Sequence, residues 1–260
     1  LKSAFISLDS RQIYDPENTA FFAVRGVHHD GHQFIESLYQ KGVREFIVEK
    51  SSWTSQLAEK AQKWSNSSIW VVTSSIKTLQ HVSKLHRLSF QLPVIGITGS
   101  NGKTICKEWL YTLTKNEYNV VRSPKSFNSQ IGVPLSVWGI QAQHTLGIFE
   151  AGISKMDEMD LLEPIIHPDF GIFTHFGEAH GQHFESEKIK LIEKLKLFRY
   201  SKKLIYRATE ETNAWIREEM QLINPHCELI SWSTTDPNQS IYVYWKTNGS
   251  KSHLKFQKKN

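Results

Sequence analysis

The chain has 260 residues, a net charge of +5, 39% hydrophobic and 22% charged residues, and two cysteines. This length and composition predict a globular protein with two domains, and so few cysteines exclude a disulfide framework and favour a reducing, cytoplasmic location. No apolar run approaches the roughly 18 residues that span a bilayer, and the scattered lysines and arginines form no nucleic-acid-binding stripe, so we expect neither membrane insertion nor a nucleic-acid partner.

In the first third of the chain, short apolar runs alternate with helix-length amphipathic segments, which is typical of an α/β protein with mostly parallel sheets. We expect strands at 20–24, 45–49 and 69–73, and helices at 33–40, 54–65 and 77–90. Pro93 then interrupts the helical pattern, because the residue before a proline is pushed out of the helical region. We therefore place a boundary between a small α/β domain, 1–91, and a second domain, 92–260.

The second domain continues the alternation of strands and helices. Strands are expected at 94–98, 118–122, 145–150, 170–175, 203–206 and 228–232, and helices at 104–115, 133–139, 156–163, 186–199 and 211–222. The last segment, IYVYWK–TNGS–KSHLKFQ, alternates like a β-hairpin.

The segment GITGSNGKT, residues 96–104, lies between an expected strand and an expected helix. Its glycines allow successive N–H groups to point at phosphate oxygens, and the helix adds its positive end. Lys103 can reach the β- and γ-phosphates of ATP or GTP, and the Thr104 hydroxyl can bind Mg²⁺. The alternative is a turn that binds nothing, but Gly-Lys-Thr between a strand and a helix favours a phosphate loop. Its contact residues are Gly99, Ser100, Asn101, Gly102, Lys103 and Thr104.

The spacing GxxGxNGKT, with Asn101 before Gly102, resembles the Mur ligase and folylpolyglutamate synthetase superfamily. Asp9-Ser10-Arg11, AFFAVRG and DGHQFI resemble the N-terminal domain of the MurE and MurF types, and NSQIGVPL from Asn128 resembles their substrate-side segment. The segments FEAG and GEAH look more like the MurF type. The stretch from His180 to Phe198 resembles ligases fused to an alanine racemase.

This resemblance implies an ATP- and Mg²⁺-dependent ligase of peptidoglycan synthesis, an activity that supports cell-wall biogenesis, cell shape and cell division. In the MurF type, UDP-N-acetylmuramoyl-tripeptide is activated as an acyl phosphate and then joined to D-alanyl-D-alanine. The chain stops before the family's adenine-binding segment and C-terminal domain, so we expect an incomplete central domain and an inactive fragment.

The resemblance also implies roles for individual residues. Asp9, Ser10 and Arg11 would hold the UDP group, although a plain turn is the alternative. Asn128 and Ser129 would face the substrate, with Ser129 standing where the MurF type usually has asparagine. The implied Mg²⁺ ligands are Thr104, Glu150, His180 and a carbamylated Lys194, and the implied catalytic residues are Lys103, His180 and Lys194.

Simpler alternatives exist for the metal residues. Glu150 ends an apolar strand, where it would lie beside the phosphate loop, but it could be a solvated acid. Lys194 belongs to a lysine-rich helix that could be a solvated basic face, and a neighbouring lysine one turn away could be the carbamylated residue instead. His175, His180 and His183 could suggest zinc, but no cysteine or carboxylate accompanies them at a usual spacing.

Two other functions remain open at this stage. One is another ligase of the superfamily, such as the MurE type or folylpolyglutamate synthetase, although DSR and DGHQFI disfavour the folate enzyme. The other is a nucleotide-binding fragment that catalyses nothing.

Overall fold

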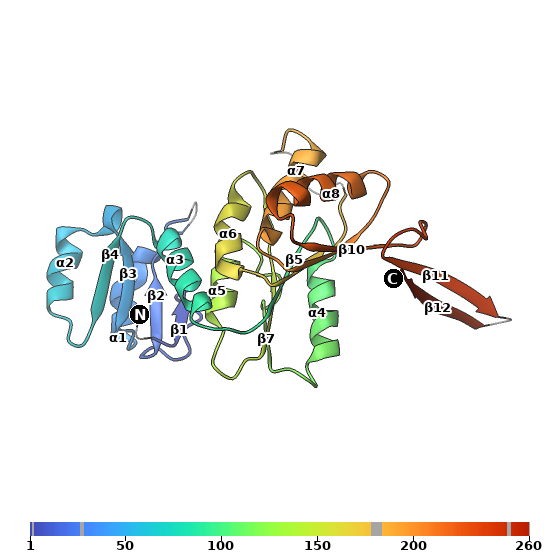
Figure 1. The fold of residues 1–260 in the computed structure, drawn as a ribbon. Coiled ribbons are helices and arrows are strands. Elements are labelled where there is room, and N and C mark those ends of the chain that lie inside the picture. Colours follow the sequence, from blue (N-terminus) through green and yellow to red (C-terminus); the bar gives the residue numbers. More distant parts are fainter. Residues whose placement is uncertain (2, 27–28, 178–183, 249–250, 260) are drawn as a thin grey trace. The chain divides into compact units, whose positions relative to one another are not determined.

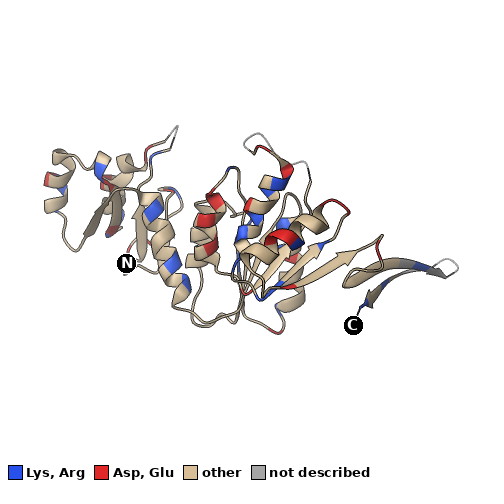
Figure 2. Ribbon diagram, turned by 45° about the horizontal axis from the view of Figure 1, so that its top comes forward, with Lys and Arg blue, Asp and Glu red and all other residues tan. Residues whose placement is uncertain are grey.

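The computed structural model describes residues 1, 3–26, 29–177, 184–248 and 251–259. The chain divides into two compact units, Leu1–His86 and Arg87–Asn260 (Figure 1). Basic and acidic residues are distributed over both units (Figure 2). Within the described residues, no helix is long and apolar enough to cross a membrane.

The first unit contains a four-stranded parallel sheet in the order β1-β2-β3-β4. Its strands are β1 (Phe5–Ser7), β2 (Thr19–Phe22), β3 (Glu45–Glu49) and β4 (Ser68–Val72). The connecting helices are η1 (Gly31–Phe34), α1 (Ile35–Gln40), η2 (Lys50–Ser52), α2 (Ser55–Gln62) and α3, which spans Ser75–Leu88. The Asp30 carboxylate caps η1 and the Thr54 hydroxyl caps α2 by accepting early backbone N–H groups.

The second unit contains an eight-stranded sheet in the order β12-β11-β10-β9-β8-β5-β7-β6. Its strands are β5 (Val94–Thr98), β6 (Val120–Arg122), β7 (Leu146–Glu150), β8 (Phe170–Phe173), β9 (Lys203–Arg207), β10 (Glu228–Ser233), β11 (Ile241–Asn248) and β12 (Lys251–Lys258). All neighbours are parallel except β11 and β12, which form the expected hairpin.

Helices cover both faces of this sheet, with α4 on the opposite side from α5 and α6 (Figure 1). Their bounds are α4 (Lys103–Thr114), α5 (Gly132–Trp138), α6 (Glu158–Ile166), α7 (Glu187–Leu195), η3 (Lys196–Phe198) and α8 (Thr212–Ile223). The expected α/β architecture with mostly parallel sheets is confirmed, and most element boundaries agree within a few residues. The three-residue strand β1 was not among the expected elements.

Strand order places the phosphate loop at a switch point of the sheet. From β5, the chain first builds β6 and β7 on one side and then crosses to β8 on the other. Such a reversal leaves a crevice at the carboxyl ends of the central strands, where α/β proteins bind ligands. The GITGSNGKT segment follows β5 at this point.

The two faces of β7 pack against different helices. Leu146 and Ile148 belong to a cluster that includes Cys106 and Leu110 of α4, whereas Phe149 belongs to the larger core on the opposite face. Because side chains alternate along a strand, Glu150 lies on the same face as Ile148, toward α4. This alternation places a carboxylate under the first turn of α4.

Candidate functional site

The phosphate loop is held by hydrogen bonds with the segment that follows β8. The Ser100 N–H donates to the His175 carbonyl at 2.7 Å, and the Thr174 hydroxyl donates to the Asn101 carbonyl at 2.7 Å. Gly99 and Gly102 have φ values of +145° and +83°, which side-chain-bearing residues rarely adopt. The sequence therefore forms a loop that is braced on one side and ends directly in α4.

Two lysines converge on Gly99 of this loop. The Lys103 ammonium donates to the carbonyl oxygens of Gly99 at 2.8 Å and Ser100 at 3.3 Å. The Lys194 ammonium, on α7, donates to the same Gly99 oxygen at 3.4 Å. Lys194 is only 3% exposed, so it is not part of a solvated basic face. These two ammonium groups give the loop a concentrated positive charge, suited to phosphate.

Burial lowers the pKa of both lysines. The pKa of Lys194 falls from 10.5 to about 7, chiefly because burial disfavours the ammonium and further because Lys103 and Lys190 lie nearby. The pKa of Lys103 is also lowered by burial, although the negative charge of Glu150 opposes the shift. A substantial fraction of Lys194 is therefore a neutral amine at neutral pH.

At the end of the loop, Thr104 is in direct contact with Glu150 of β7. The Thr104 hydroxyl lies 3.0 Å from Glu150 Oε2 and 3.2 Å from the Ser126 hydroxyl. Glu150 is completely buried, so it is not a solvated acid at a strand end. Hydroxyl and carboxylate oxygens are the ligands that Mg²⁺ prefers, so this pair fits the expected cation.

A cavity of about 580 Å³ opens beside the loop. It brings together six residues that sequence analysis selected: Gly99, Ser100, Lys103, Asn128, Ser129 and Lys194. Its lining also includes Lys190 and Glu158. Three lysines against one carboxylate make the lining basic, which favours an anion.

A second cavity, of about 470 Å³, lies on the other side of the loop along α4. Asn101 and Gly102 line this cavity rather than the first one. Its other walls are largely apolar and include Trp109 and Trp232. Five of the six selected loop residues are thus divided between these two cavities, and Thr104 lines neither of them.

Family comparisons agree with this geometry. The family model described as "Mur ligase middle domain" matches residues 97–260, and the one described as "Mur ligase family, catalytic domain" matches residues 2–93. The chain belongs to the Mur ligase family.

Curated and solved Mur ligases supply closer comparisons. The UDP-N-acetylmuramoyl-tripeptide--D-alanyl-D-alanine ligase of Borreliella burgdorferi is 31% identical over 238 residues, which are 87% of this chain and 49% of that protein. MurF from Acinetobacter baumannii matches with a TM-score of 0.81 and 21% identity, over 97% of this chain and 52% of that one. MurF ligase from Thermotoga maritima, solved in complex with ADP, has a TM-score of 0.78 and 24% identity, over 97% and 55%. The chain thus spans about half the length of these Mur ligases.

The predicted UDP-binding residues lie in the first unit of this Mur ligase. The Arg11 guanidinium donates two hydrogen bonds to the Asp9 carboxylate, both at 2.9 Å. The backbone N–H of Arg11 also donates to this carboxylate. Hydrogen bonding from Arg11 lowers the pKa of Asp9 to about 2. Ser10 lies between them in the same turn. The Asx-turn considered as the simpler alternative is therefore present, and UDP binding by these residues stays a prediction.

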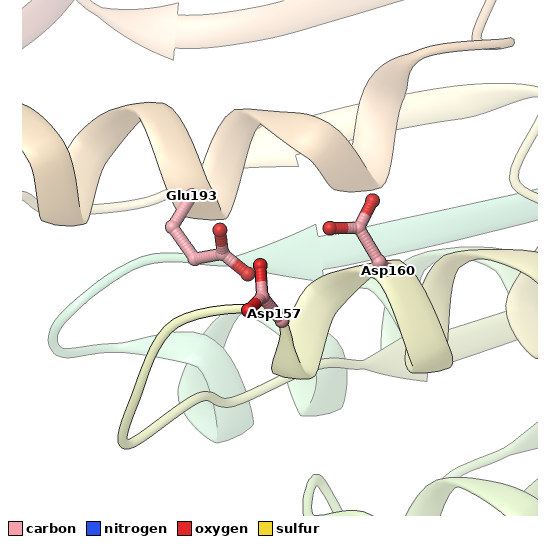
Figure 3. A group of neighbouring side chains, drawn as sticks. All are labelled: Asp157, Asp160 and Glu193. Atoms are coloured by element: carbon pink, nitrogen blue, oxygen red, sulfur yellow. The ribbon is translucent and has the colours of Figure 1, made fainter.

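A group of acidic residues elsewhere in the second unit could suggest another metal site. Asp157 and Asp160 of the α6 region and Glu193 of α7 bring ligand atoms within 4.8 Å of one another (Figure 3). However, the Lys196 ammonium lies 2.6 Å from Asp160 and 2.7 Å from Glu193. Arg199 also pairs with Asp160. The protein's own cations neutralise this group, so we assign no metal there.

Some predicted residues cannot be placed, and some important ones were not predicted. His180 and His183 lie outside the described residues, so neither the magnesium role of His180 nor a histidine zinc site can be assessed. Sequence analysis did not single out Lys107, which contacts Glu150, or Ser126, which contacts Thr104. Lys107 follows Lys103 by one helical turn, and this spacing alone could have indicated that it also faces the loop.

Proposed function

We propose that this chain is the N-terminal and middle part of an ATP-dependent MurF-type ligase, which joins D-alanyl-D-alanine to UDP-N-acetylmuramoyl-tripeptide. One observation carries this proposal: Lys103 and Lys194 both donate hydrogen bonds to the Gly99 carbonyl, and the same loop ends at Thr104, which contacts Glu150. The name of the Borreliella burgdorferi relative and the ADP complex of the Thermotoga maritima neighbour support the substrates and the nucleotide.

In the proposed reaction, a substrate carboxylate attacks the γ-phosphate of ATP, and ADP leaves. The resulting acyl phosphate has a good leaving group, which the amine of D-alanyl-D-alanine displaces. Since charge spreads over the transferring phosphoryl group, catalysis depends on positioning and on nearby cations. Lys103 would turn from the Gly99 carbonyl to the phosphate oxygens, and the loop N–H groups would orient them.

We propose that Thr104 and Glu150 hold Mg²⁺, together with His180 and carbamylated Lys194. Mg²⁺ bound there would neutralise phosphate charge. The lowered pKa of Lys194 supports carbamylation, because CO₂ reacts only with a neutral amine. The modification replaces an ammonium with an anion, which suits a cation site.

Asn128 and Ser129 are proposed to face the substrate across the cavity from Lys194. The Ser129 hydroxyl oxygen accepts the Gly132 N–H at 3.2 Å, which leaves its O–H as a donor and its second lone pair as an acceptor. We assign the UDP group to the first domain around Asp9, Ser10 and Arg11. The domain boundary remains our proposal at residues 91 and 92, and cytoplasmic location likewise remains a prediction.

Calorimetry on this chain tests the phosphate site. We expect inorganic triphosphate and ATP to bind with similar, weak affinity, because the resemblance places the adenine contacts beyond residue 260. A far higher affinity for ATP would contradict that assignment. In the whole protein, release of ADP should require the UDP-substrate, and release that depends instead on a folate or on no acyl substrate would refute the MurF-type assignment.

A further inference from the structure

Lys107 is the most deeply buried lysine among the described residues, and its ammonium is fully engaged. Lys107 and Glu150 are each 0% exposed, and the Lys107 ammonium lies 3.0 Å from Glu150 Oε1. A buried lysine is costly unless it is paired with an opposite charge and its remaining protons are hydrogen-bonded. Here the ammonium also donates to the carbonyl oxygens of Ser123, at 2.8 Å, and Lys125.

These contacts join three segments that meet at Thr104. Lys107 is on α4, Glu150 ends β7, and the two carbonyl groups belong to the loop after β6. Lys125 has a φ of 48°, a conformation that few non-glycine residues adopt, and its carbonyl accepts from Lys107. The same loop supplies Ser126, whose hydroxyl contacts Thr104. Lys107 thus contacts one neighbour of the Thr104 hydroxyl, Glu150, directly, and it contacts the residue just before the other neighbour, Ser126.

The two oxygens of Glu150 have different partners. Oε1 forms an ion pair with the Lys107 ammonium but accepts no hydrogen bond within the described residues, whereas Oε2 accepts the hydrogen bond of the Thr104 hydroxyl. Because the Lys107 ammonium holds Oε1, Oε2 is the Glu150 oxygen that remains to face Thr104. Outside this pair, Glu108 approaches Lys107 at 3.2 Å and also pairs with Arg122, so the ammonium is held from the surface side as well.

We propose that Lys107 is a positioning residue for the cation end of the site. It acts through Glu150 by directing Oε2 toward Thr104, and it has no direct contact with nucleotide. This inference rests on the proposed function, which makes Thr104 and Glu150 the ligands of Mg²⁺. It adds a residue whose positive charge is needed at a site that binds a positive ion.

The test measures the affinity of the chain for the Mn²⁺–triphosphate complex by water proton relaxation. Lys107→Met is expected to weaken binding at least tenfold, because Glu150 loses the partner that orients it. If Lys107 were only a nearby positive charge, its removal would strengthen cation binding. If it only stabilised the fold, the thermal midpoint would fall and the affinity of the folded protein would not change. Either result would overturn the proposal.

A double-mutant cycle tests whether Lys107 acts through Glu150. Glu150→Gln should weaken binding, and adding Lys107→Met to that variant should cause no further loss. Additive losses would refute the proposed route. The matched control is Lys196→Met, which removes a lysine pairing at 2.7 Å with the buried Glu193 and should leave Mn²⁺–triphosphate affinity unchanged. If Lys107→Met does not fold, Lys107→Gln replaces it, with a loss expected in the same direction.

Crystal structures separate this proposal from the proposed function. If the wild-type chain failed to bind Mn²⁺–triphosphate, the assignment of the magnesium site would be wrong. The position of Glu150 in Lys107→Met, or in Lys107→Gln, would still decide the role of Lys107. We expect the Thr104–Glu150 contact of 3.0 Å to be broken in that variant. An unchanged contact would overturn the proposal, whether or not the chain binds Mn²⁺–triphosphate.

Discussion

The ammonium groups of Lys103 and Lys194 approach the same carbonyl oxygen, that of Gly99, at 2.8 Å and 3.4 Å. Burial weakens the hydration of these ammonium groups, and like charges in one buried place also repel each other, so the site favours loss of a proton. The Lys194 pKa of about 7 is the consequence. Lys194 can therefore react as an amine at neutral pH, unlike an ordinary surface lysine.

This pKa predicts how Lys194 affects stability. Between its folded pKa of about 7 and the ordinary value of 10.5, the unfolded chain binds more protons at this lysine than the native protein does. The Lys194 contribution to unfolding free energy should therefore rise with pH across this window and be lost as pH falls through 7. Urea denaturation at several pH values should show this rise in the wild type relative to Lys194→Met. Parallel pH profiles for the two proteins would contradict the shifted pKa.

The neighbouring Lys190 provides a second check on the same pKa. Because its positive charge lowers the pKa of Lys194, Lys190→Met should raise that pKa toward 10.5. The ¹³Cε chemical shift of Lys194, followed by NMR during a pH titration, measures the change directly. Lys188→Met, at an exposed position of the same helix, is the control and should change the value less.

Carbamylation of Lys194 is predicted from the family resemblance and supported by its burial and lowered pKa. Incubation of the chain with ¹³C-bicarbonate at about pH 9 should give a carbamate carbon signal in the NMR spectrum. The signal should be absent from Lys194→Met and retained by Lys190→Met. If it persisted in the first variant and disappeared from the second, the modified lysine would be one helical turn earlier.

Replacement of Lys103 should separate phosphate binding from UDP binding. Lys103→Met is expected to weaken triphosphate binding by about 1.5–3 kcal/mol, roughly 10- to 150-fold, because it removes a charged hydrogen-bond donor. Calorimetry can measure this loss, with Lys115→Met at an exposed position after α4 as the control. In the whole protein, Lys103→Ala should abolish acyl-phosphate formation and leave UDP-substrate binding nearly intact. A comparable loss of UDP-substrate affinity would refute the proposed division between domains.

The two left-handed glycines of the phosphate loop should differ in their tolerance of alanine. At Gly99, an added Cβ would overlap the Thr174 hydroxyl and lie 3.1 Å from the His175 carbonyl oxygen. At Gly102, nothing lies within 4 Å, so only backbone strain of about 1–2 kcal/mol is expected. Gly99→Ala should therefore lower the unfolding free energy by about 3 kcal/mol or more, which is a larger loss than Gly102→Ala should cause. Equal losses in urea denaturation would show that Thr174 does not brace the loop.

Local patterns in the sequence were sufficient to predict the phosphate loop and most of the elements around it. Glycine spacing, a strand before the loop and a helix after it are all local features, so GITGSNGKT could be interpreted without tertiary contacts. The apolar run ending in Glu150 likewise predicted a buried strand with a carboxylate at its carboxyl end. The resemblance then suggested Lys194 within a lysine-rich helix, where periodicity alone could not distinguish one lysine from another.

Which charges are buried together was decided only by the tertiary structure. The order β8-β5-β7 brings α7 to one side of the loop and Glu150 under α4, so the Gly99 carbonyl meets Lys194 and the Glu150 carboxylate meets Lys107. Neither contact can be predicted from local sequence. A lysine in an amphipathic helix is usually solvated, and no sequence spacing identifies its partner on a distant strand. The sequence by itself determined the loop, the alternating elements and the kind of ligand they suit. The shifted pKa of Lys194 and the orientation of Glu150 were decided by burial and by proximity across the sheet, which exist only in the folded chain.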